Sequence, residues 1–188
     1  MKKIFAALIL AVLVVLCGPT AFADGSEVIE TGPCGEGLSW TLTRDGTLTI
    51  SGEGDMESTP WEPYKNIIKT RVMEEGITSI ANGAFKGYSG LTGTLDIPST
   101  VKTIGGEAFM GCSGFTGSLI LPEGLKTING YSTFEGCSGF TGDLILPEGL
   151  GYIGDDNTFY GCTGFDGKLY IPGSVSVINY EIFSGCSG

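Results

Sequence analysis

The chain has 188 residues with 21 acidic and 10 basic side chains, so its formal net charge is −11, and it contains no histidine. This acidic balance, without any run of lysine or arginine, argues against binding to nucleic acid or to anionic lipid, since both depend on clustered basic residues. The absence of histidine excludes Ser-His-Asp and Cys-His catalysis. The expected class is therefore a non-enzymatic protein that needs no cofactor.

The first two dozen residues have the three parts of a secretory signal. Lys2 and Lys3 form a basic start, residues 4–16 are uniformly apolar, and residues 21–23 read Ala-Phe-Ala, as a signal-peptidase site requires. Thirteen apolar residues are short for a membrane span, which needs about 20. We predict that residues 1–23 are cleaved and that the protein is secreted or held at the cell surface, with no membrane insertion after cleavage. The rest carries −13, since two of the basic residues and none of the acidic ones lie in the signal.

From about Ile68 onward the sequence repeats with a period of 24 or 25 residues. Each unit reads apolar-x-apolar-Pro, then an isoleucine, and then Phe-x-Gly-Cys, with the extra residue between Ile and Phe in the third and fourth units. The four clearest units begin at Leu95, Leu119, Leu144 and Leu169, and a degenerate copy with Tyr88 in place of cysteine precedes them. A period of this length is typical of leucine-rich repeats.

A repeat of this kind predicts coils that stack at about 4.8 Å and share one interior. The period of two in the strand places Leu119 and Leu121 inside and Ser118 and Ile120 outside. Proline ends the strand because it lacks a donor, and the segment around Phe-x-Gly-Cys is expected to make a helical turn closed by glycine. We expect a β-rich α/β solenoid of about five coils over residues 68–188.

The same repeat resembles the BspA-like leucine-rich repeat of bacterial surface proteins. The resemblance rests on the unit Leu-x-Leu-Pro-x-x-Leu-x-x-Ile followed by Phe-x-Gly-Cys-x-x-Phe, and residues 34–64 are similar to the module that often precedes such repeats. It implies an adhesin or another surface binding protein whose ligand is an extracellular protein or a glycan.

Residues 24–67 are expected to form a module that covers the first coil. Apolar and polar residues alternate on both sides of a turn at residues 44–46, so residues 38–51 predict a β-hairpin. Trp61 and Tyr64 are expected to pack across the junction. Arg71 occupies the inward position that leucine holds in later coils, which leaves either an imperfect first coil or a slip in register.

Several groups of reactive side chains are candidate sites, and a structural role is favoured for each. Glu123 and Glu148 occupy equivalent places one coil apart, where solvated turn residues are the simpler reading than paired acids. Residues 155–157, Asp-Asp-Asn, offer oxygen ligands for calcium but match no calcium loop, so a polar turn is favoured. Five cysteines follow the signal, and the last four recur at intervals of 25, 25 and 24 residues, so we predict inert buried thiols and no metal site; the five are Cys34, Cys112, Cys137, Cys162 and Cys186.

The outward positions of the stacked strands form the favoured partner-binding surface. One residue per coil occupies this row: Asp96, Ile120, Ile145 and Tyr170. Thr94, Ser118, Asp143 and Lys168 flank them. An exposed apolar stripe on a concave sheet marks partner contact, although the β-propensity of Ile and Tyr accounts for them equally.

Two functions follow from this architecture. The first is a binding or adhesion module for proteins or glycans. The alternative is an envelope scaffold that assembles end to end, because the sequence stops at Gly188, just before the next strand would begin. That position leaves open a fragment, a truncated reading frame, or an end that meets a partner or a second copy of the chain.

Overall fold

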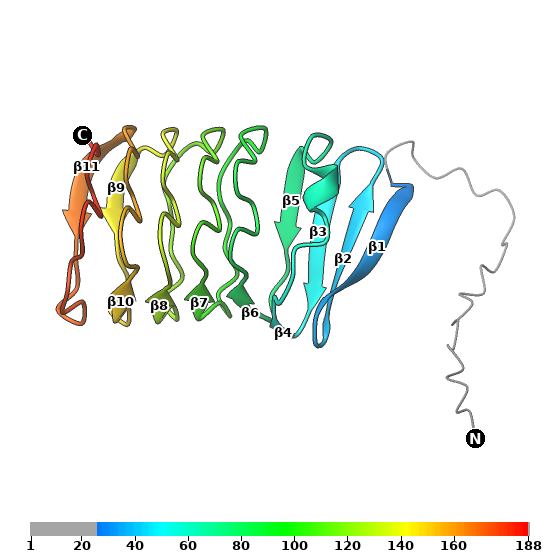
Figure 1. Ribbon diagram of the computed structural model, residues 1–188, viewed down its shortest axis with the longest axis horizontal. Coiled ribbons are helices and arrows are strands. Elements are labelled where there is room, and N and C mark those ends of the chain that lie inside the picture. The colour runs from blue at the N-terminus through cyan, green and yellow to red at the C-terminus, as the bar shows by residue number, and fades with distance from the viewer. Residues whose placement is uncertain (1–25, 188) are drawn as a thin grey trace, which may run out of the picture.

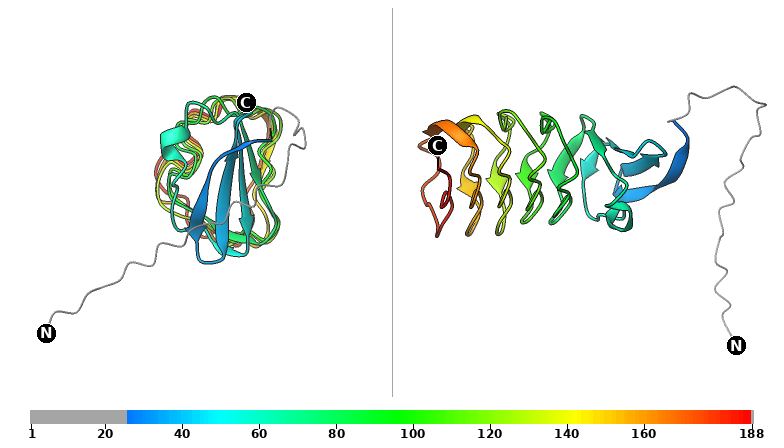
Figure 2. Two further views of the ribbon diagram at one scale, coloured as in Figure 1. Left: turned by 90° about the vertical axis from the view of Figure 1, so that its right-hand side faces the viewer. Right: turned by 90° about the horizontal axis from the view of Figure 1, so that it is seen from above.

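The protein is a straight stack of β-coils preceded by a β-sheet, as a computed structural model shows (Figure 1). The structure describes residues 26–187, so the predicted signal at residues 1–23 lies outside the described residues. Viewed along the stack, successive coils superimpose on one outline (Figure 2). Each coil has three sides. In the coil that begins at Leu119, the Leu-x-Leu side is residues 119–121, the Thr-Ile side is Thr127–Ile128 and the turn side is residues 132–137.

The N-terminal sheet continues the Leu-x-Leu side of the solenoid. Its order is β1-β2-β3-β5, with antiparallel pairing from β1 to β3 and parallel pairing of β3 with β5. The strands are β1 (Val28–Gly35), β2 (Leu38–Thr43), β3 (Thr47–Gly52) and β5 (Thr70–Met73). The hairpin expected at residues 38–51 is β2 and β3. Strand β1 was not anticipated, because its first six residues are exposed or half-buried and lack a buried alternating face.

The strands that pair continuously from coil to coil lie on the Thr-Ile side, where the sequence predicted no strand. A parallel sheet with the order β10-β8-β7-β6-β4 runs along this side. Its members are β4 (Gly54–Asp55), β6 (Ile77–Ile80), β7 (Thr103–Ile104), β8 (Thr127–Ile128) and β10 (Tyr152–Ile153). In β6, β7, β8 and β10 the last isoleucine faces the core and is buried, while the residue before it is half-buried.

The Leu-x-Leu side pairs less completely than expected. Beyond β5, the regular strands on this side of the described coils are β9 (Gly142–Ile145) and β11 (Phe165–Tyr170), which pair in parallel, and the coils between are joined by single bridges such as Gly93 with Phe115. Proline lies three positions after the first leucine of each unit and has no N–H to extend the pairing. The leucine ladder nevertheless forms, since Leu144 pairs with Leu169 and both Leu119 and Leu144 are buried.

The helical part of the expected α/β class is not confirmed. The only helix among residues 26–187 is the 3-10 turn η1 (Glu62–Tyr64). The segment before each Phe-x-Gly-Cys instead donates every second N–H to the next coil, as Phe85 N does to Ala108 O at 2.7 Å and Phe109 N to Thr133 O at 2.9 Å. A helix would need these donors for bonds within its own segment. The closing glycine is confirmed in a left-handed conformation, with φ of 71° at Gly111.

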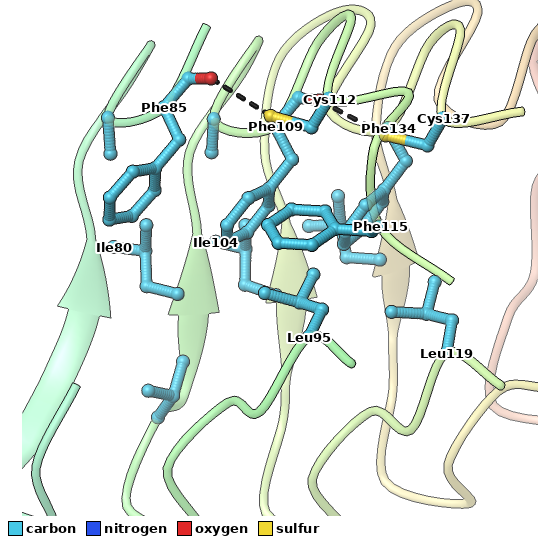
Figure 3. Close-up of a cluster of buried hydrophobic side chains, with 14 of the residues drawn as sticks. Ile80, Phe85, Leu95, Ile104, Phe109, Cys112, Phe115, Leu119, Phe134 and Cys137 are labelled. Atoms are coloured by element: carbon cyan, nitrogen blue, oxygen red, sulfur yellow. Dashed lines mark hydrogen bonds between the residues drawn. The ribbon is translucent and has the colours of Figure 1, made fainter. Parts of the chain in front are cut away.

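Aromatic and thiol ladders fill the interior (Figure 3). Neighbouring phenylalanine rings stack nearly parallel, with centroids 5.4 Å apart for Phe109 and Phe134 and 5.3 Å for Phe134 and Phe159. Each coil cysteine donates its S–H to a phenylalanine carbonyl of the preceding coil, as Cys112 does to Phe85 at 3.0 Å. The Phe85 carbonyl also accepts the Tyr88 N–H at 3.1 Å, so the S–H bond chiefly gives the buried thiol a partner.

The inserted residue of the 25-residue coils is accommodated by buried threonines. Thr133 and Thr158 occupy the position of Ala84 and Ala108 in shorter coils and are fully buried. The Thr158 hydroxyl donates to the Ile153 carbonyl at 2.6 Å. The wider turn therefore retains hydrogen-bonded backbone despite its extra residue.

The junction between the N-terminal sheet and the solenoid is closely packed. Trp61 is fully buried, stacks on Phe85 with centroids 6.0 Å apart, and donates its ring N–H to the Ala84 carbonyl at 2.9 Å. Tyr64 lies against Trp40 at 5.9 Å. The expected packing across the junction is thus confirmed for Trp61, whereas the ring contact of Tyr64 lies within the N-terminal module. The role of residues 24–67 as a cap remains a prediction.

Arg71 occupies the leucine ladder without a slip in register. Arg71 is 8% exposed. Its guanidinium lies 4.9 Å from the centroid of the Phe115 ring and donates a hydrogen bond to the Thr94 carbonyl at 2.9 Å. Ile77 and Leu95 on either side remain buried at their expected positions. Burial lowers the pKa of Arg71. The first coil is therefore imperfect in composition rather than in register.

Candidate functional site

The row predicted from the sequence is an exposed stripe on the Leu-x-Leu side. Ile120 is 73% exposed, Ile145 is 55% exposed and Tyr170 is 44% exposed. Ile120 pairs with Ile145, and Ile145 pairs with Tyr170, so the three lie on consecutive coils. Asp96 is also exposed and precedes Ile120 by one coil. The structure thus brings the three apolar residues together and places a carboxylate at one end of them.

A groove of about 590 Å³ follows this stripe. Ile120 and Ile145 line it together with buried leucines of the ladder, and carboxylates stand on both sides, Asp143 before the strand and Glu123 after it. The stack is close to straight in both long views, so the expected concave sheet is absent and the hollow is local (Figures 1 and 2).

Hydrogen bonds hold the residues that flank the stripe. Asp143 accepts the backbone N–H of Lys168 at 2.7 Å, and Thr94 donates to Asp96 at 3.3 Å. The Tyr170 hydroxyl donates to Glu148, and this bond together with the carboxylate charge raises the pKa of Tyr170. Because these side chains are already positioned, a ligand would pay little entropy to order them.

Val72 extends the same row and was missed by the sequence analysis. It is 42% exposed and follows Arg71, as Asp96 follows Leu95. It pairs with Thr49 of β3, which places the N-terminal sheet on the same side. The sequence placed Arg71 in register with Leu95, so the alternation that turns Ile120 outward would have identified Val72 as well.

The paired-acid and calcium hypotheses find no support in the geometry. Glu123 and Glu148 are exposed on the rim, and only Glu148 has a partner, Tyr170. Asp155 accepts the Tyr152 hydroxyl, and Asp156 accepts the Tyr180 backbone N–H at 3.2 Å. Over residues 26–187 no three His, Cys, Asp or Glu side chains gather as a metal site would require.

The cysteines lie in the core as free thiols. Cys112, Cys137 and Cys162 are buried, and Cys186 in the last coil is half-buried. Desolvation raises the pKa of Cys112 and of Cys162 to about 12, and it raises that of Cys137 further. A thiol is nucleophilic only as thiolate, so these groups are unsuited to covalent chemistry at neutral pH.

The chain has bacterial leucine-rich-repeat proteins as its structural neighbours. A leucine-rich repeat protein from Eubacterium ventriosum is 26% identical with a TM-score of 0.57, over 81% of this chain and 40% of the other. A leucine rich cell surface protein from Faecalibacterium prausnitzii is 22% identical with a TM-score of 0.53, over 90% of this chain and 53% of the other. The chain therefore spans about half or less of the length of these two proteins, and the second shows the shared fold alone.

Two further observations bear on the family. No curated protein is significantly similar to the chain in sequence. Among the described residues, 26–187, there is no helix with the length and apolarity to cross a bilayer. The pattern of the BspA type leucine rich repeat region matches residues 64–188 with six copies, and repeats of this family typically serve as non-enzymatic binding scaffolds. The chain belongs to the BspA-type leucine-rich-repeat family.

Proposed function

We propose that this chain is an exported, non-enzymatic binding module whose Leu-x-Leu side contacts an extracellular protein or glycan in adhesion. The observation that carries the proposal is the exposure of Ile120 and Ile145 beside a groove of about 590 Å³. Membership of a repeat family found in bacterial surface proteins supports it.

Leaving the apolar stripe of Ile120, Ile145 and Tyr170 in water costs free energy that contact with a partner would recover. Burying apolar area is worth roughly 25 cal/mol per Å², and contiguous exposed apolar residues mark interaction surfaces more often than scattered ones do. Tyr170 adds an aromatic anchor of the kind that carries binding energy at protein interfaces. The carboxylates on both rims supply polar contacts that fix orientation.

The test is a binding screen of the chain against extracellular matrix proteins and glycans, repeated with Ile120→Ser, Ile145→Ser and Tyr170→Ser combined. These residues are exposed, so the thermal midpoint should change little while binding to any ligand found is lost. The matched control is Ile67→Ser, which removes an apolar residue of 43% exposure at a distant turn. Unchanged binding by the triple variant would reject the stripe as the contact.

End-to-end assembly is a second candidate, favoured by the last described coil. Leu169 is 48% exposed and Ile178 is 53% exposed, whereas Leu144 and Ile153 one coil earlier are 4% and 0% exposed. Such a face is complementary to another coil. Trp61 of the N-terminal module packs on the first coil, so the proposed contact joins two C-terminal faces about a two-fold axis.

Light scattering over a range of concentrations tests this assembly. A dimer that dissociates on Leu169→Lys with Ile178→Lys, or on fusion of an additional coil after Gly188, supports it. The matched control, Ile120→Lys with Ile145→Lys, should leave the dimer intact. A monomer at all concentrations excludes it.

A further inference from the structure

A second exposed surface lies at the corner between the Thr-Ile side and the turn side. Tyr131, Asp156 and Tyr180 occupy the same position on three consecutive coils, each directly before the left-handed residue of the turn. Tyr131 is 59% exposed and Tyr180 is 71% exposed. Tyr160 on the adjoining turn side is 40% exposed. We call this surface the tyrosine edge.

The backbone of the tyrosine edge is fixed by bonds between coils. The Tyr131 carbonyl accepts Glu107 N at 2.8 Å, the Asp156 carbonyl accepts Ser132 N at 3.0 Å, and the Tyr180 carbonyl accepts Asn157 N at 3.2 Å. The Asp156 carboxylate also accepts the Tyr180 N–H. Tyrosine side chains on a rigid backbone lose little entropy on binding, which is why they dominate binding loops.

Acidic residues far outnumber basic residues in the coils that carry the tyrosine edge. Residues 127–188 contain seven acidic residues and a single basic one, Lys168, giving a net charge of −6. Lys168 lies in β11, on the Leu-x-Leu side. The two ion pairs within residues 26–187 are Arg44 with Glu27 and Lys86 with Glu107, so no cation pairs with the carboxylates of the edge there.

Neighbouring carboxylates raise the pKa of two tyrosine hydroxyls, Tyr180 in the edge and Tyr152 beside it. The Tyr152 hydroxyl donates to Asp155, and this bond raises the pKa of Tyr152 to about 12. Glu181 and then Asp156 raise the pKa of Tyr180. Aromatic faces beside carboxylates with no internal counter-ion attract ammonium or guanidinium groups by cation–π and ionic contacts.

We propose that the tyrosine edge is a second binding site, which takes an arginine- or lysine-bearing segment of a partner polypeptide. One cationic side chain meets the Asp156 carboxylate, with Tyr131 on the coil before it and Tyr180 on the coil after it. Neighbouring coils are about 4.8 Å apart, so each tyrosine stands about one coil spacing from Asp156, within the range of a cation–π contact. This site lies on a different side of the coil from the Ile120 stripe and does not depend on it.

Fluorescence anisotropy of a labelled twelve-residue peptide of alternating arginine and glycine tests the proposal. Citrulline in place of arginine gives a neutral probe of nearly the same shape, and binding is measured at about 50 mM and about 150 mM salt. We expect the arginine peptide to bind and the citrulline peptide to bind at least tenfold more weakly. Equal binding of both peptides would show that charge is not recognised and would overturn the proposal.

Three variants locate the contact. Asp156→Asn keeps the oxygen that accepts the Tyr180 N–H and should weaken binding about two- to fivefold, while Tyr131→Ser with Tyr180→Ser should weaken it about five- to twentyfold. The control is Asp143→Asn, because Asp143 also accepts an N–H of the next coil but lies on the Leu-x-Leu side. Its effect should stay below about 1.5-fold. Equal losses in the two Asn variants, or no loss in the serine variant, would reduce the interaction to net charge and reject the site.

Discussion

The first and the last described coils bury equivalent positions to different extents. At the first coil, Trp61 is fully buried on Phe85 and hydrogen-bonded to Ala84, and Ile80 is 1% exposed. In the last described coil, Ile178 is 53% exposed although its equivalent Ile153 is fully buried. The isoleucines are equivalent, so the difference comes from whether a described layer packs on both sides of them. Stability in such a stack is therefore a property of neighbouring coils more than of each repeat.

The largest expected effect comes from removing an aromatic layer at the covered end. Trp61→Ala deletes a stacked ring and leaves the Ala84 carbonyl without its donor, so the free energy of unfolding should fall by about 3–5 kcal/mol. Phe183→Ala, in the last described coil, should cost only about 1–2 kcal/mol, because Phe183 is half-buried and its described ring contact is with Phe159, at 5.6 Å. Urea denaturation measures both, and equal losses would contradict the contrast between the ends.

An effect that is smaller for each pH unit is expected from alkaline pH, acting through Cys112 and Cys162 of the middle coils. Unfolded thiols ionise near the ordinary pKa of 9.0, whereas burial raises the pKa of Cys112 and of Cys162 to about 12 in the folded state. The folded state therefore holds protons that the unfolded state releases, and stability present below pH 9 is lost between about pH 9 and 12. Each thiol should contribute up to about 1.4 kcal/mol per pH unit in that window.

Urea denaturation at a series of pH values measures this slope. Cys112→Ala with Cys162→Ala should make the curve shallower above pH 9 while lowering stability at pH 7. A slope that both proteins share would assign the alkaline loss to other groups, such as the tyrosines.

The smallest expected effect is a difference in labelling that leaves stability unchanged. Cys186 is half-buried in the last described coil, while Cys137 is enclosed by coils on both sides. A thiol reagent at pH 8 should therefore modify Cys186 first, and Cys137 only on global unfolding, because a thiol must be both exposed and ionised to react. Mass spectrometry of timed samples measures the order, with Cys186→Ala as the control. Simultaneous modification would show that the last coil is as well covered as the middle ones.

Much of the fold could be predicted from residues that recur at fixed offsets. The spacing of Leu119, Leu144 and Leu169 predicted a shared ladder, and the repeated Phe-x-Gly-Cys predicted buried rings and thiols. The exposed row of Ile120, Ile145 and Tyr170 followed from the alternation within one strand. These predictions succeeded because each depends on side-chain pattern alone, and the same pattern is present in every coil.

Other features depended on contacts between coils, which no single repeat encodes. The Thr-Ile sheet has strands of only two residues in most coils, too short for a periodic signal, and it exists because neighbouring coils supply each other's hydrogen bonds. The glycine of Phe-x-Gly-Cys suggested a helical turn on the turn side. The N–H groups of that segment instead donate to carbonyls of the next coil.

The sequence by itself determined the repeat, the composition of the core and the residues that alternate outward, because these are set by which side chains must leave water. Only the tertiary structure decided which backbone segments pair, how Arg71 is held in the ladder, and that Tyr131, Asp156 and Tyr180 share one edge. Those outcomes depend on stacking at the spacing of a β-sheet, which brings together residues that lie about 25 positions apart in the chain.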